Sequence, residues 1–67
     1  MIEVHVYIVY YDENGQPKRD VHTYEYSAGK WQQHESQLIA LFSLMLESNG
    51  VYKINFNRDG ERFHQIA

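Results

Sequence analysis

Apolar and polar residues alternate along the first strand-like stretch of the chain, residues 2–11. The stretch is rich in β-branched and aromatic types. A two-residue period in such residues is typical of a β-strand with one buried face. The expected buried positions are Ile2, Val4, Val6, Ile8 and Tyr10.

A second strand is expected over Val21–Ser27, after a connection over residues 12–20. Asn14 and Gly15 supply turn chemistry, because both tolerate positive φ. Pro17 lacks a backbone N–H and therefore disfavours an early start of the strand. The two strands are predicted to form a hairpin.

The register of this hairpin decides which face carries Glu25. A two-residue turn at Asn14-Gly15 places Glu25 opposite Val4, on the apolar face. A pairing shifted by one residue places Tyr26 opposite Val4 and turns Glu25 outward. We favour the second register, because the free-energy cost of burying an unpaired carboxylate exceeds the free energy gained from the preferred turn.

Residues Trp31–Ser48 predict a helix of about four to five turns that ends at Asn49-Gly50, with Gly50 as a left-handed C-cap. The first half is polar, whereas apolar residues nearly encircle the second half. One small sheet covers only one side of such a helix, so we expect a second copy of the chain to cover the other. The expected dimer interface is Ile39, Leu41, Met45 and Leu46.

A third strand is expected over Val51–Asn57, followed by a turn over 58–60 and a short edge strand over Glu61–Ile66. The predicted fold is α+β with the order β-β-α-β-β. An antiparallel sheet carries one helix packed on one face, and the domain dimerises through helix and sheet. Residues 1–67 are expected to form a single domain.

Composition narrows the classes of function. The chain has 67 residues, no cysteine and a net charge of -3. A core this small is marginal, and without thiols the added stability is expected from a partner chain. Acidic residues outnumber basic ones by 9 to 6, which argues against a general nucleic-acid binder. Because no membrane helix or signal peptide is visible, we expect a cytoplasmic protein with no membrane partner.

The candidate chemistry is sparse. Four histidines occur, but no pair has ligand spacing on a helix, so no metal is expected. No serine, histidine and acid fall into a recognisable catalytic motif. We therefore expect a chain without enzymatic activity and without a cofactor.

The order of several motifs resembles the small uracil-DNA glycosylase inhibitors of protein-primed Bacillus phages. The motifs are Asp12-Glu13-Asn14-Gly15, then Tyr24-Glu25-Tyr26-x-x-Gly29, a helix, and Val51-Tyr52-Lys53-Ile54-Asn55-Phe56. Two features depart from the family pattern. The loop before Tyr24 is longer, and the residues beyond Asn57 look like an addition.

The resemblance implies a homodimer that imitates DNA and blocks the glycosylase of a bacterial host without catalysis. An apolar pocket at the dimer seam takes the side chain that the enzyme inserts into DNA, and carboxylates replace phosphates. The expected partner-binding residues include Tyr24, Glu25 and Tyr26, which match the family motif, and Glu35, which corresponds to an acidic helix residue. His34 belongs to the same set, and Leu38 and Phe42 are expected to form the apolar wall of the pocket. His34 stands where the family has an aromatic residue.

Two other functions remain open from the sequence. One is a small dimeric interaction module of another phage or bacterial pathway. The other is a single-stranded nucleic-acid binder that stacks bases on Tyr7, Tyr11 and Tyr24. The acidic net charge favours a protein partner over nucleic acid.

Overall fold

The computed structural model describes residues 1–67 and has the predicted order β-β-α-β-β. The elements are β1 (Ile2–Tyr11), β2 (Pro17–Tyr26), α1 (Ala28–Ser43), the 3-10 helix η1 (Leu44–Glu47), β3 (Val51–Arg58) and β4 (Glu61–Ile66). The strands form one antiparallel sheet in the order β2-β1-β3-β4. The predicted α+β fold is confirmed.

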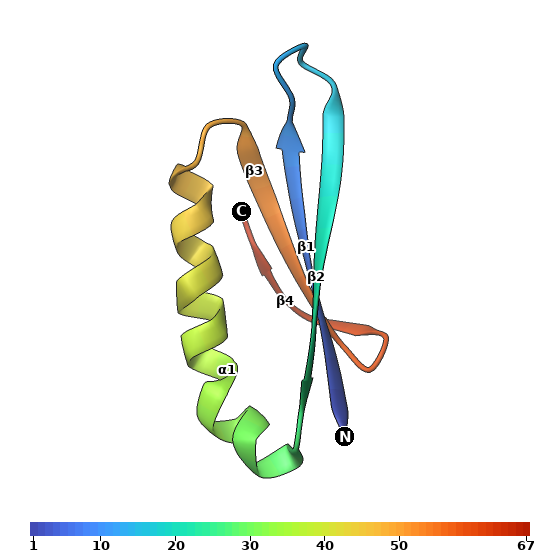
Figure 1. The fold of residues 1–67 in the computed structure, drawn as a ribbon. Helices are drawn as coiled ribbons and strands as arrows, with labels where there is room; N and C mark the ends of the chain where they lie inside the picture. Colours follow the sequence, from blue (N-terminus) through green and yellow to red (C-terminus); the bar gives the residue numbers. More distant parts are fainter.

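Helix α1 lies along one face of the sheet only (Figure 1). We call this the covered face and the other the open face. The covered face holds the core, whose buried side chains are Val4, Val6, Ile8, Trp31, Leu38, Phe42, Ile54 and Phe56. Aromatic rings join the layers, because Trp31 meets Phe63 edge-on at 5.5 Å and Phe42 meets Phe56 at 6.1 Å.

The loop between β1 and β2 is not the two-residue turn that Asn14-Gly15 suggests. A type I′ turn needs positive φ at both residues, and only Gly15 has it, at 75°. The backbone N–H of Gly15 donates to Asp12 O, and that of Asp12 donates to Gln16 O. This is a three-residue loop closed by a left-handed glycine.

The observed register pairs Val4 with Tyr24 and Ile2 with Tyr26. The predicted pairing of Tyr26 with Val4 was therefore wrong by two residues. The predicted face was right, since Glu25 lies on the open face while Tyr24 and Tyr26 pack near the core. A shift of two residues keeps every side chain on its face, which is why the energetic argument still held.

Strand β2 begins at Pro17, so the predicted connection over 12–20 was too long. Pro17 pairs with Tyr11 at the outer edge of the sheet, where β2 has only one neighbour. A missing N–H is tolerated at the first residue of an edge strand. Proline therefore did not delay the strand.

Helix α1 begins three residues before the predicted start at Trp31. Ser27 caps it by accepting from Lys30 N at 3.4 Å. The α-helix also ends early, at Ser43, and continues as η1. The Ser43 hydroxyl donates to Ile39 O at 2.7 Å, a bond that competes with the helical ladder. Gly50 has the expected positive φ, 89°, but Ser48 caps η1.

Neither helical segment combines the length and apolarity that a membrane-spanning helix requires.

Candidate functional site: a groove between strand β2 and helix α1

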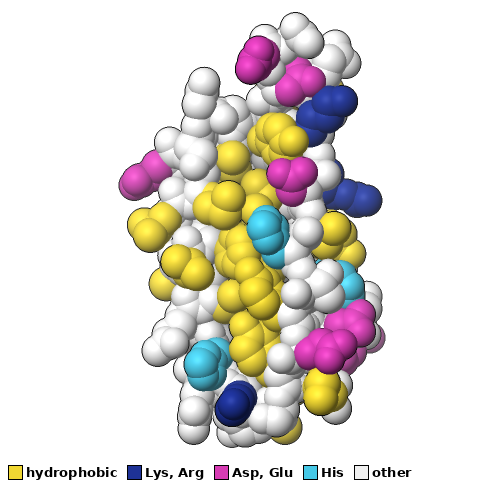
Figure 2. All heavy atoms as spheres, in the orientation of Figure 1, with side chains coloured by type: hydrophobic (Ala, Val, Ile, Leu, Met, Phe, Trp, Pro, Cys, Tyr) yellow, Lys and Arg dark blue, Asp and Glu magenta, His cyan; other side chains and the backbone are white.

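A groove of about 220 Å³ runs between β2 and α1. Its lining residues are Tyr24, Tyr26, His34, Gln37, Leu38 and Leu41. Figure 2 shows apolar side chains gathered in a strip between these two elements, with histidines beside it. We call this the β2–α1 groove.

The periodicities of a strand and a helix together create the groove. Tyr24 and Tyr26 are two apart on β2 and therefore project to the same face. His34, Leu38 and Leu41 recur at spacings of four and three, which place them on one flank of α1. Facing flanks from two elements thus form the two walls.

Aromatic contacts hold the walls in place. The rings of Tyr24 and Tyr26 lie 6.3 Å apart, and Tyr26 lies 5.9 Å from the His34 ring. Tyr26 also lies 5.4 Å from the buried Trp31 ring. Tyr26 therefore connects the groove to the core through Trp31.

Burial raises the pKa of the Tyr26 hydroxyl above its usual value, and the nearby Tyr24 adds a smaller upward effect. Tyr26 is thus neutral at physiological pH and offers a hydroxyl at the groove. No carboxylate lines the groove. Its chemistry suits an apolar or aromatic side chain, with His34 and Gln37 as polar neighbours.

The structure brings four predicted partner-binding residues together in the groove: Tyr24, Tyr26, His34 and Leu38. It does not bring the two predicted carboxylates there. Glu25 lies on the open face, directly opposite Glu3. Glu35 follows His34 along α1, and consecutive helical side chains point about 100° apart, so it sits on the other flank. Glu35 is half-buried.

Phe42 does not line the groove either. Its side chain is only 5% exposed and packs near His22, Tyr24 and Phe56. Its main role in the protomer is therefore in the core. Leu38 is 7% exposed and serves both the core and the groove wall.

The predicted dimer residues divide into two groups. Ile39, Met45 and Leu46 are partly buried against the protomer's own core. Leu41 remains 62% exposed. Leu44, which the sequence interpretation left out of the interface, is 63% exposed and lies one turn beyond Leu41. Their three-residue spacing was the signal that could have placed both on one uncovered flank.

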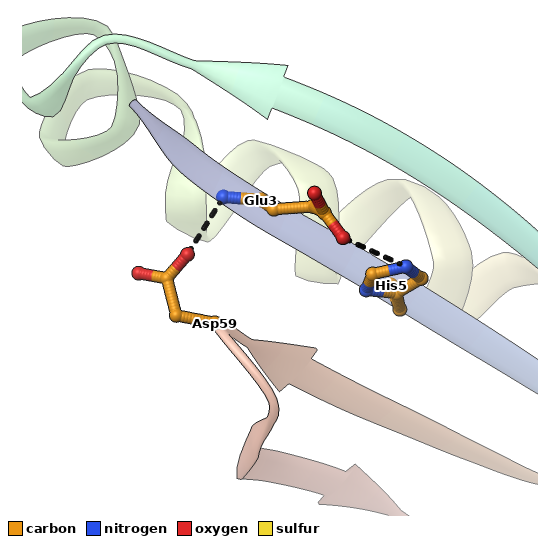
Figure 3. Close-up of polar contacts among 3 residues, drawn as sticks. All are labelled: Glu3, His5 and Asp59. Carbon is orange, nitrogen blue, oxygen red and sulfur yellow. Dashed lines mark hydrogen bonds and ion pairs between the residues drawn. The ribbon is translucent and has the colours of Figure 1, made fainter.

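Polar contacts gather at the end of β1 where the chain begins (Figure 3). Glu3 N donates to Asp59 Oδ1 at 3.0 Å, and Asp59 N donates to Glu3 O at 2.9 Å. His5 Nε2 lies 3.3 Å from Glu3 Oε1. These bonds fix the β3–β4 turn against β1. No group of three His, Asp or Glu side chains is arranged to hold a metal ion.

The three tyrosines of the nucleic-acid hypothesis do not form one platform. Tyr7 and Tyr11 lie on the open face, whereas Tyr24 lies on the covered face. A single strand stacking on all three would have to reach both sides of the sheet. That version of the hypothesis was wrong.

Comparison of the chain with protein-family models, with curated proteins and with solved structures gave no match. The resemblance to the glycosylase inhibitors therefore rests on the short motifs named above.

Proposed function

We propose that this chain is a non-catalytic inhibitor of a bacterial uracil-DNA glycosylase that acts as a dimeric DNA mimic. The observation that carries the proposal is the β2–α1 groove. Tyr24 and Tyr26 form one wall of the groove. Leu38 and Leu41 belong to the other wall, and the side chain of Leu41 is 62% exposed. The proposed setting is the cytoplasm of a phage-infected host.

The groove suits a wedge residue of the enzyme. An apolar side chain that enters a DNA stack must separate stacked bases, at a cost of a few kcal/mol per step. The groove offers burial at about 25 cal/mol per Å² without such a cost. Competition therefore favours the inhibitor wherever the wedge fits the groove.

Leu41 and Leu44 are the proposed contact with a second copy through the helix. Both side chains are more than half exposed, and Leu41 also lines the groove. A second copy seated on this flank would deepen an open groove into a pocket at the seam. A two-fold axis would generate two such pockets.

The acidic charge supports docking on a basic surface. A net charge of -3 would attract the DNA-binding face of an enzyme and raise the association rate. Glu25 and Glu35 lie outside the groove of their own protomer. As phosphate mimics they would therefore contact the enzyme around the pocket rather than inside it.

The deciding experiment is uracil excision from a labelled oligonucleotide by bacterial uracil-DNA glycosylases, with the chain titrated in. We expect loss of activity near two chains per enzyme. Leu41→Glu, which places a charge on the groove wall, should weaken inhibition at least tenfold. Ser36→Glu is the matched control, because Ser36 is exposed on α1, does not line the groove and points about 140° away from Leu41 around the helix.

Glu25→Gln and Glu35→Gln test the carboxylates separately, and each should slow association without changing the groove. Absence of inhibition across glycosylases of several hosts would contradict the proposal. Equal potency of Leu41→Glu and Ser36→Glu would contradict the assignment of the groove as the binding site. The chain would then be better described as an interaction module with another target.

A further inference from the structure

Charge on β2, β1 and β3 of the open face is sorted along the strands. The edge strand β4 adds one cation, Arg62, which pairs with Asn57 and donates to Gln65 Oε1 at 3.0 Å. The register places residues in rows across the sheet, because directly paired residues share a face. One end row holds the carboxylates of Glu25 and Glu3, with Asp59 beside Glu3 on the other side. This row carries no cation.

Six residues further along β1, a second row carries the opposite charge. Val9 pairs with Arg19 on β2 and with Lys53 on β3. At about 3.4 Å per residue, the basic and acidic rows lie about 20 Å apart. Arg19 is held toward the middle of the face, because its guanidinium carbon lies 5.1 Å from the Tyr7 ring centre.

Two rows between these ends hold groups that lack partners. His5 pairs with Asn57, and Tyr7 pairs with Asn55. The side-chain oxygens of both asparagines are buried and accept no hydrogen bond within the protomer. A buried oxygen without a hydrogen-bond donor destabilises the folded protein. Val21, opposite Tyr7 on β2, is 53% exposed.

We propose that the open face joins two copies of this chain, sheet against sheet, with their strands antiparallel. The two-fold axis would lie between the sheets and run across the strands. Each strand would then face its own copy with the order of rows reversed. Arg19 would lie opposite Glu25 of the partner subunit, and Lys53 opposite Asp59 of the partner subunit.

The middle rows also match under this operation. Tyr7 would face His5 of the partner subunit, and Asn55 would face Asn57 of the partner subunit. Two amides can exchange donor and acceptor roles, which would give the unpaired oxygens their donors. Sheets pack face to face about 10 Å apart, a distance that side chains of this length fill.

Charge complementarity favours an antiparallel second copy of the chain over a parallel copy or a nucleic acid. With strands parallel, the acidic row would face an acidic row and the basic row a basic row. A nucleic acid lying along the face would meet Glu3 and Glu25 at one end, and its phosphates would be repelled there. Only a surface with the same two rows in reverse order matches both ends.

The open-face contact is independent of the helix seam in the proposed function. The β2–α1 groove lies on the other side of the sheet and stays accessible. With both contacts formed, the assembly would be larger than a dimer. Arg19→Glu, at a residue that the proposed function does not use, would lower the mass and leave inhibition of the glycosylase unchanged. Glu25→Arg is assessed by mass alone, because Glu25 is also a proposed contact with the enzyme.

Sedimentation equilibrium at low salt tests the inference with a charge swap. Arg19→Glu and Glu25→Arg should each halve the mass found for the unmodified chain, and the double variant should restore it. Restoration cannot arise within one protomer, because the two positions are about 20 Å apart along the sheet. Far-UV circular dichroism would confirm that each variant is folded.

Lys30→Glu is the matched control, because Lys30 is exposed on α1 and lies off the sheet. It should keep the mass of the unmodified chain. An unmodified chain with the same mass as Arg19→Glu would overturn the inference. So would a double variant that stays at the lower mass.

Discussion

The backbone of Gly50 closes against the backbone of Tyr11. Tyr11 N donates to Gly50 O at 2.9 Å, and a Cβ atom on Gly50 would lie 2.5 Å from Tyr11 O. The φ of Gly50 is 89°, in the left-handed region. This contact joins the loop after η1 to the end of β1 and sets where β3 begins beside it.

Gly50→Ala should therefore destabilise the fold. The left-handed backbone costs about 1–2 kcal/mol for a residue with a Cβ, and the close approach to Tyr11 O adds to it. Gly29→Ala is the control, because Gly29 lies in α1 with no atom within 4 Å of the new Cβ. It should stabilise by about 0.5–1 kcal/mol. Urea unfolding measures both changes, and equal midpoints would contradict this account.

Phe42→Ala should unfold the chain or nearly so. Removing a buried phenylalanine side chain costs about 3–5 kcal/mol. A domain of this length has about 3–10 kcal/mol in total, at 0.05–0.15 kcal/mol per residue. Leu44→Ala, at an exposed position, should change the free energy of unfolding by less than about 0.5 kcal/mol. Thermal melts would separate the two, and a mild effect of Phe42→Ala would return that residue to the list of groove candidates.

Alkaline pH should weaken the fold through Tyr26. Burial raises the pKa of its hydroxyl in the folded state, so the unfolded chain loses this proton first as pH rises. The contribution is fully present below about pH 10 and is lost as pH climbs through the folded pKa. Melting temperatures at pH 8 and at about pH 11 should fall further for the unmodified chain than for Tyr26→Phe. Identical falls would show that another group is responsible.

Asp12 should stabilise the hairpin loop. Its Oδ1 accepts from Asn14 N and Gln16 N, both at 2.9 Å. Asp12→Ala removes both acceptors at once and should cost about 1 kcal/mol, as loss of a local cap does. Glu13→Ala, one residue further on, removes an exposed side chain that makes no hydrogen bond there and should be nearly neutral. Chemical unfolding of the two variants gives the comparison, and a neutral Asp12→Ala would contradict it.

The groove was partly visible in the sequence. The motif Tyr24-Glu25-Tyr26 predicts two aromatics on one face with a carboxylate on the other, and the structure has this arrangement. Which helix flank would meet those rings was not readable, because apolar residues nearly surround the second half of α1. The packing of α1 on the sheet determines this flank, because it buries Leu38 and Phe42 and leaves Leu41 exposed.

The spacing of apolar residues determined the four strands, the helix and their order. A two-residue period indicates a strand, and apolar residues spaced three and four apart indicate a helix. It also determined which side of β2 carries Glu25, since a side chain's face depends only on odd or even register. The exact register depended on the loop, where Asp12 and Gly15 form backbone contacts that a turn motif does not reveal. Only the tertiary structure placed Arg19 and Lys53 in one row and Glu3 and Glu25 in another, because strand pairing joins residues that are far apart in the chain.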